Sequence, residues 1–253
     1  MMTNQPISKS KRVWIPLTAI LVLLLAGSAN PTATAATAQT QAAPTTTTVS
    51  SPLQVEYEID CTNAVNVQVN LDTSSYDVIA RKIIPVDCGS LPTQSLSTQL
   101  YFDVFTIPTY AHLSITTNDE FNRTVRMYTN YVTLSEVPQA STLQMNTDIP
   151  FQITEPVDGS TISNLSFQVM GSIVTNSSSP LNIQLISETG RILSHEAVFV
   201  PLTMLGKDYP FEATLYLPRL SEPTGARLVM QQSASDIYGV KFATSVQVTI
   251  DQD

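Results

Sequence analysis

Apolar and polar residues alternate along most of this chain, and that period of two limits what the chain can fold into. Val55, Tyr57 and Ile59 are separated by single polar residues, and residues 65–71 repeat the pattern. Successive side chains of a strand point to opposite faces, so the alternation predicts strands with one buried and one solvated face. No amphipathic helical pattern stands out beyond the N-terminal segment. The sequence therefore predicts an all-β fold.

The expected strands are separated by clusters of Asn, Asp, Ser, Pro and Gly, which favour turns. Later strands of the first half are expected at 77–85, 99–107, 112–116 and 124–134. Those of the second half are expected at 151–154, 165–174, 182–187, 192–200, 211–217, 226–232 and 242–250. Seven strands in about one hundred residues are typical of an immunoglobulin-like sandwich. We expect two tandem antiparallel β-sandwich domains, the second of them immunoglobulin-like.

Amino-acid composition also distinguishes linker segments from the expected folded domains. Residues 31–50 are almost entirely Thr, Ala, Gln, Pro and Ser and cannot bury a core. The alternation also lapses within 135–150. The expected organisation is a signal peptide with its cleavage region at 1–38, a disordered linker at 39–52, a first domain at 53–138, a second linker at 139–149 and a second domain at 150–253.

The N-terminal segment has the order of a secretory signal peptide. Lys9, Lys11 and Arg12 precede an apolar run at 13–26, which ends in small residues. The run is shorter than a membrane-spanning helix needs, so cleavage is favoured over a permanent anchor. Ser28 stands where a lipoprotein signal would need Cys. Small residues allow cleavage before Asn30, Ala36 or Gln39. The chain is expected to be secreted or held at the cell surface.

Charge limits the partners. The leader carries three of the twelve basic residues and none of the twenty-one acidic ones, so the mature chain has a formal charge of −12. Such a surface repels nucleic acid and anionic lipid. The expected partner is a protein or a cell-surface glycan, and a membrane only if the leader stays uncleaved.

Cys61 and Cys88 are the only cysteines, and both follow the export signal. In an oxidising compartment they predict a disulfide rather than two free thiols. Two cysteines and two distant histidines supply too few ligands for a zinc site. We predict no metal and no cofactor.

The chain has no clear catalytic set. His112 and His195 lie in different expected domains, and no Gly-x-Ser-x-Gly nucleophile elbow is present. We interpret both histidines as structural or solvent-facing.

Paired acids occur at Glu56 with Glu58 and at Asp119 with Glu120. They could act as acid and base only if one were desolvated at a fixed distance from the other. We interpret them as solvated, and predict no catalytic residue.

Two other binding chemistries deserve comparison with their structural explanations. The oxygen-rich segments 118–122 and 158–160 could contribute to a calcium site, although turn formation explains them equally well. The only Trp, Trp14, lies in the leader, and Tyr128 and Tyr131 have opposite parity on one strand. An aromatic platform for sugar is therefore weakly supported. Tyr101 and Phe105 share parity, as core residues also would.

The second half carries motifs seen elsewhere. Residues 153–163 contain Pro156 and the turn Gly159-Ser160-Thr161, and residues 169–172 end in Gly171-Ser172. Gly190, Pro210-Phe211 and residues 228–236 continue the pattern. Together, about residues 150–250 resemble the immunoglobulin-like domain of bacterial spore germination proteins. The chain departs from that pattern after Asp236, where Ile237-Tyr238 precede the Gly. The resemblance implies a non-catalytic extracytoplasmic module, and it does not extend to the first half.

Two functional hypotheses remain. The leading one is a secreted or cell-surface, non-catalytic β-sandwich protein that acts as a binding, adhesive or structural module. The alternative is a carbohydrate-binding module or a weak hydrolase of cell-wall polymers.

Overall fold

The computed structural model describes residues 47–75, 77–103, 109–135, 137, 139–233 and 239–252. They belong to the unit Ala43–Asp253. The first unit, Met1–Ala42, holds the predicted signal peptide and lies outside the described residues. Within the described part of the chain, no helix has the length and apolar character needed to span a membrane.

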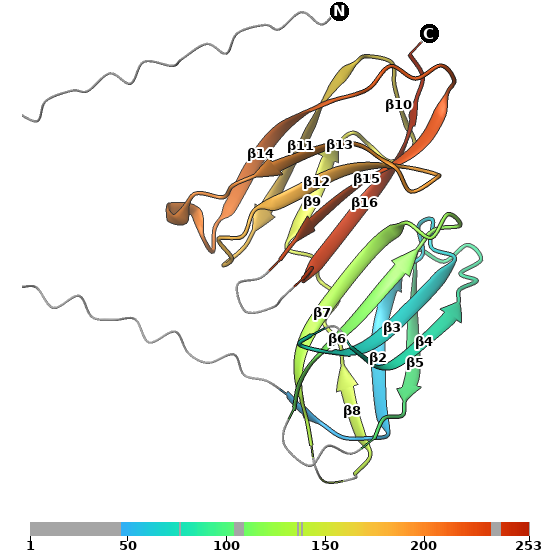
Figure 1. Cartoon of the computed structure of the whole chain (residues 1–253), viewed down its shortest axis with the longest axis vertical. Coiled ribbons are helices and arrows are strands. Elements are labelled where there is room, and N and C mark those ends of the chain that lie inside the picture. Colours follow the sequence, from blue (N-terminus) through green and yellow to red (C-terminus); the bar gives the residue numbers. More distant parts are fainter. Residues whose placement is uncertain are drawn as a thin grey trace, which may run out of the picture. The chain divides into compact units, whose positions relative to one another are not determined.

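Strands dominate both halves of the described chain (Figure 1). The first half contains β1 (Thr47–Val49), β2 (Leu53–Asp60), β3 (Asn66–Thr73), β4 (Val78–Pro85), β5 (Thr93–Leu100), β6 (Thr109–Asn118), β7 (Thr124–Leu134) and β8 (Ser141–Gln144). The second half contains β9 (Phe151–Glu155), β10 (Ser160–Ile162), β11 (Ser166–Val174), β12 (Leu181–Ser187), β13 (Ile192–Val198), the 3₁₀ turn η1 (Leu202–Met204), β14 (Asp208–Tyr216), β15 (Thr224–Gln232) and β16 (Phe242–Ile250). The predicted all-β class is confirmed.

The first half packs two sheets around one core. One sheet has the order β5-β2-β8, and the other contains β4-β3-β6-β7 with β1 added along β7. Alternate residues of β2 and β3 point inward, as the period of two predicts. The buried residues of this core are Val49, Leu53, Val55, Tyr57, Ile59, Val67, Val69, Leu71, Leu100, Ala111, Leu113, Ile115, Val132, Leu134 and Met145.

The second half repeats this arrangement. A sheet of order β14-β11-β9 packs against β13-β12-β15-β16, and β10 is added along β16. Its core is separate from that of the first half. The core includes Leu181, Ile183 and Leu185 on β12, together with Val169 on β11 and Leu228 on β15.

The two sandwiches share one connectivity that sequence alone did not reveal. In each, a three-residue strand runs parallel to the last strand of the larger sheet: β1 beside β7, and β10 beside β16. The expected first linker, 39–52, is therefore not irregular throughout, because β1 lies within it and Val49 is only 1% exposed.

The expected second linker, 139–149, also differs from the structure. It contains β8, which pairs in parallel with β2 over Leu53–Glu56. The expected strand at 99–107 is displaced as well, because β5 occupies Thr93–Leu100; residues 104–108 lie outside the described part.

A direct strand pairing joins the halves. β7 and β16 are antiparallel neighbours, with Tyr128 opposite Phe242 and Arg126 opposite Thr244. The larger sheets of the two sandwiches thereby form a single ten-stranded sheet.

Candidate functional site

The predicted disulfide is present. Cys61 follows β2 and Cys88 follows β4, and their sulfur atoms are bonded with the Cα atoms 5.8 Å apart. The bond ties together two loops of the first sandwich.

The two histidines occupy different sandwiches and face different surroundings. His112 on β6 is 3% exposed, and its ring centroid lies 4.7 Å from that of Tyr131 in an edge-on arrangement. Burial lowers the pKa of His112 below its ordinary value. His195 is exposed on the edge strand β13, opposite Gln184. The structure does not bring these side chains into one site.

Asp119 contradicts the interpretation that its acidic pair is solvated. Its side chain is buried, and Oδ2 accepts hydrogen bonds from Nε of Arg123 at 2.8 Å and from Nε of Arg227 at 2.9 Å. Oδ1 accepts the backbone N–H groups of Phe121 and Arg123. These donors occupy both carboxylate oxygens, so the segment 118–122 is part of an ion cluster rather than an open calcium loop.

The surroundings of Asp119 favour the ionised form of its carboxylate. Burial alone would raise the pKa of Asp119, but the hydrogen bonds and charges of Arg123 and Arg227 outweigh it and hold the pKa below its ordinary value. Arg227 is 1% exposed, and its Nη1 donates to Oγ of Ser245 at 3.0 Å. Arg227 lies on β15 and Asp119 at the end of β6, so the cluster joins the two sandwiches.

The other acids and aromatics that the sequence singles out differ in their exposure. Glu56 and Glu58 share the outer face of β2, as predicted, and Glu58 is exposed. Tyr101 is 69% exposed, whereas Tyr128 is 2% exposed and unable to act as a surface platform. Phe105 lies outside the described residues.

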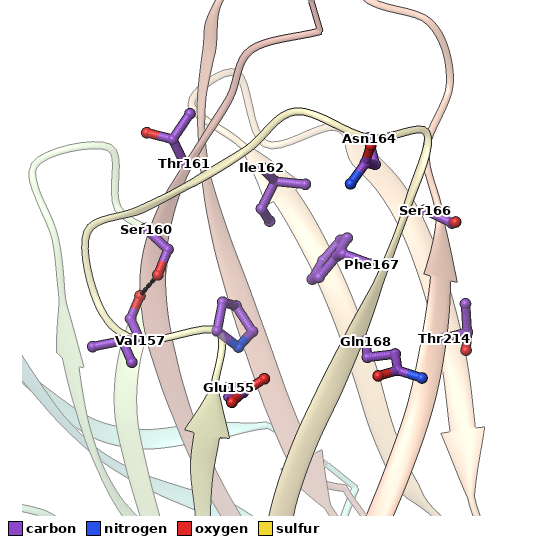
Figure 2. Close-up of a pocket in the computed structure, with 11 residues that line it drawn as sticks. Glu155, Val157, Ser160, Thr161, Ile162, Asn164, Ser166, Phe167, Gln168 and Thr214 are labelled. Atoms are coloured by element: carbon purple, nitrogen blue, oxygen red, sulfur yellow. Dashed lines mark hydrogen bonds between the residues drawn. The ribbon is translucent and has the colours of Figure 1, made fainter.

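The second sandwich contains an open groove where the chain leaves β9, crosses to β10 and returns along β11. Figure 2 shows the segment from Glu155 to Ser166 arching across this region, with the side chains of its own Ile162 and of Phe167 on β11 beneath it. The groove has a volume of about 630 Å³. Its lining residues are Glu155, Pro156, Val157, Ser160, Thr161, Ile162, Asn164, Ser166, Phe167, Gln168 and Thr214.

Apolar and polar groups are separated within the groove. Ile162 is almost fully buried, and Phe167 is half-buried against the core of the sandwich, so they provide an apolar floor. Asn164 and Gln168 are exposed on the rim, which is formed mostly by amides and hydroxyls. Nε2 of Gln168 donates to Glu212 at 2.6 Å, which orients this amide. Glu155 is the single ionisable side chain among the lining residues.

Local hydrogen bonds hold the loop in place. Gly159 adopts φ 81°, which an L side chain rarely does, and its N–H donates to the carbonyl of Gln247 at 2.8 Å. Asp158 Oδ1 accepts the N–H of Gln247 at 2.6 Å, and the hydroxyl of Ser160 donates to the carbonyl of Val157 (Figure 2). The loop is therefore fastened to β16, and this attachment fixes the shape of the groove.

The sequence suggests 158–160 either as a turn or as part of a calcium site, and it does not predict the groove. The turn Gly159-Ser160 is visible in the sequence, but the approach of this loop to β11 is not. The Ala234-Ser235-Asp236 corner of the resemblance lies outside the described residues.

Comparisons with known proteins give distant similarities alone. No protein family and no curated protein matches the chain. Among solved structures, a candidate carbohydrate-binding protein from Bacteroides uniformis ATCC 8492 is 9% identical, with a TM-score of 0.33 over 79% of this chain and 99% of that one. A tetra-tandem repeat from the extending region of a large adhesion protein is 11% identical, with a TM-score of 0.26 over 79% and 50%. A variant of the enterotoxigenic E. coli CFA/I adhesin CfaE is 9% identical, with a TM-score of 0.25 over 82% and 98%. At these TM-scores the similarities carry no argument about function.

Proposed function

We propose that this chain is a secreted or cell-surface, non-catalytic binding module that takes a neutral glycan in the groove of its second sandwich. The observation that carries the proposal is the groove itself, with an apolar floor at Ile162 and Phe167 beneath a rim in which amides and hydroxyls predominate and Glu155 is the single ionisable side chain.

The size and chemistry of the groove suit a sugar. Ligand pockets commonly have volumes of about 300–1,000 Å³ and combine an apolar lining with a few polar groups. A pyranose ring presents a C–H face that can pack on Phe167, while its hydroxyls can exchange hydrogen bonds with Asn164 and Gln168. A strongly charged ligand finds no complementary set of charges in this lining.

Binding is favoured over hydrolysis because of the carboxylates. Most glycoside hydrolases use two acids that flank the scissile bond. Among the lining residues of this groove, Glu155 supplies one carboxylate, and no second acid accompanies it. The hydrolase form of the alternative hypothesis therefore has no support from this site.

The predicted location and the disulfide agree with this role. The Cys61–Cys88 bond is of a kind that persists in oxidising compartments outside the cytoplasm. Secretion itself is tested by fractionation and by intact mass, which would reveal removal of the leader. The relationship to spore germination domains stays a prediction.

Glycan binding is tested by an array of cell-surface polysaccharides, followed by titration calorimetry of the strongest ligand. We expect Asn164→Ala and Gln168→Ala to weaken binding about tenfold each, because each removes a rim hydrogen bond. Both side chains are exposed, so neither substitution opens a core cavity.

The matched control is Gln144→Ala, which removes an exposed amide from β8 of the other sandwich. It should bind as the parent does. The proposal would be contradicted if no polysaccharide on the array bound the protein, or if Asn164→Ala and Gln168→Ala bound the ligand with the same affinity as the control.

A further inference from the structure

We infer that both sandwiches are built to bear mechanical load along the chain. Each holds a short early strand, β1 or β10, parallel to the last strand of its larger sheet, so that tension between the chain ends shears a set of hydrogen bonds together. This function rests on the strand pairing of β10 and of β1 rather than on ligand contacts, although β10 also lines the groove.

The first sandwich shows the arrangement at its N-terminal edge. β1 pairs with β7 in parallel, with Thr47 opposite Val132 and Val49 opposite Leu134. Beyond the end of β7, the N–H of Ser135 donates to the carbonyl of Val49 at 2.8 Å. The side chains of Val49 and Leu134 are buried, which keeps water from this end of the pairing.

The second sandwich repeats the arrangement with β10 and β16. These strands pair in parallel, with Ser160 opposite Val248 and Ile162 opposite Ile250. Beyond the end of β16, the N–H of Asp251 donates to the carbonyl of Ile162 at 2.9 Å. In both sandwiches, the residue that follows the last strand therefore bonds to the final residue of the short early strand.

A second parallel pairing reinforces the first sandwich. β8 runs alongside β2, with Leu53 opposite Ser141 and Glu56 opposite Gln144. The N–H of Met145 donates to the carbonyl of Glu56 at 2.8 Å. The outgoing chain is thus fastened to the incoming chain at a second place.

Parallel pairing resists unfolding when the load is applied along the paired strands. End-to-end tension enters the second sandwich through β9, which pairs with β11, and it reaches β10 once β9 has separated. When the N-terminal side of β10 and the C-terminal side of β16 are then pulled apart, the force lies along the strands. All interstrand bonds are then strained at once and must fail together. In an antiparallel hairpin pulled at its open end, the bonds fail one after another, so each carries the load alone. The same chain can therefore be strong in one direction and weak in another.

This difference gives a direct experiment. The full chain is held by handles at its two ends and its unfolding force is measured by single-molecule force spectroscopy. In a second arrangement, one handle is attached at Ser221→Cys and the other at the C-terminus. That arrangement peels β16 from β15, starting at the Thr224–Ile250 pair. We expect the second sandwich to unfold at a clearly higher force in the end-to-end arrangement.

Proline variants test the named bonds. Asp251→Pro removes the donor to Ile162, whereas Asp251→Ala keeps the backbone N–H and is the matched control. Under constant end-to-end load, we expect Asp251→Pro to unfold about fivefold faster than Asp251→Ala, as the loss of one backbone hydrogen bond implies. In the peeling arrangement, the bonds of this end of β16 break one at a time, so we expect a smaller difference in rate between the two variants.

Ser135→Pro and Ser135→Ala make the equivalent test in the first sandwich. If one proline variant does not fold, the proline variant of the other sandwich still tests the inference. The comparison of the two pulling directions in the parent chain tests it as well. Equal unfolding forces in the two directions, or equal rates for the proline and alanine variants under end-to-end load, would overturn the inference. Asn164→Ala serves to separate the two proposals, because it should weaken glycan binding and leave the unfolding force unchanged.

Discussion

Oδ2 of Asp119 accepts a hydrogen bond from Nε of Arg227 across 2.9 Å, although the two residues are 108 positions apart in the chain. Both side chains are buried, and they come from different sandwiches. A buried ion pair contributes little net stability relative to an apolar pair, but breaking one side of it leaves a charge without compensation. The pair therefore acts mainly on the energetic coupling between the two sandwiches, because each sandwich supplies one of the two charges.

Asp119→Asn should lower the free energy of unfolding by about 3–5 kcal/mol, because two buried guanidinium groups lose their counter-charge. Urea denaturation followed by circular dichroism measures the change. Glu120→Gln is the matched control, since it removes an adjacent but exposed carboxylate. A loss no larger for Asp119→Asn than for Glu120→Gln would show that the cluster is not structurally important.

Asp119 also shows what local sequence patterns omit. Asp119 and Glu120 look equivalent in an acidic chain, and their local context predicts that both are solvated. One of them is buried because its partner Arg227 arrives from a distant strand, and no local pattern records such a long-range contact. The burial of Val55, Tyr57 and Ile59 is predicted correctly, because it follows directly from the local period of two.

Stability should fall as the pH drops below the ordinary histidine pKa of 6.5, in part because of His112. Burial lowers its folded-state pKa below the ordinary 6.5, so the unfolded chain binds the proton more readily. The loss begins near the unfolded-state pKa and continues until the pH reaches the folded-state pKa. Asp119 does not contribute in this window, because the stabilisation linked to its lowered pKa is lost only as the pH falls below its ordinary value of 3.8.

His112→Gln should reduce the slope of unfolding free energy against pH between those limits. Urea midpoints at several pH values, compared with those of the parent chain, provide the measurement. An unchanged slope would mean that the buried imidazole does not govern this pH dependence.

Gly171→Ala should destabilise the second sandwich by about 1–3 kcal/mol through overpacking. A Cβ atom at this position would collide with the backbone carbonyl of Gln152 and would lie 2.7 Å from the ring of Phe211. Thermal unfolding measures the loss, and Ser172→Ala on the same strand is the control. Equal melting temperatures for the two variants would contradict this reason for the glycine.

The Gly171 position has a sequence signal, because a small residue paired with Gly is part of the resemblance described for the second half. The structure supplies its physical cause, namely the close approach of β9 and Phe211. The groove has no comparable signal. It depends on how the loop after Glu155 crosses β11, and that crossing follows from the pairing of β10 with β16 rather than from any local spacing.

Replacing both cysteines, as Cys61→Ser with Cys88→Ser, should lower the free energy of unfolding by about 3.5 kcal/mol on the chain-entropy relation. The relevant loop closes over a separation of 27 residues. Urea denaturation of the double variant, with the parent chain in oxidising buffer as reference, measures this cost. A difference below about 1 kcal/mol would show that the unfolded chain gains little freedom when the bond is absent.

The strands whose positions differ from the sequence prediction share a cause. The alternation predicts a strand at 99–107, yet β5 lies earlier and its inward positions include Thr98, which is 4% exposed although polar. β8 is short and carries Ser141 and Gln144 at its ends, so its composition indicates a linker. Both strands are determined by the neighbour they pair with, β2, and therefore by tertiary contacts.

The pairing of β7 with β16 has a consequence for how this protein can be divided. A cut between the sandwiches, at 139–149, would leave β7 on one fragment and β16 on the other, each with unpaired backbone groups along a newly open strand edge. Such fragments would associate with one another or self-associate through these open edges, even if each kept its own hydrophobic core. An expression clone or a domain swap should therefore carry both halves together.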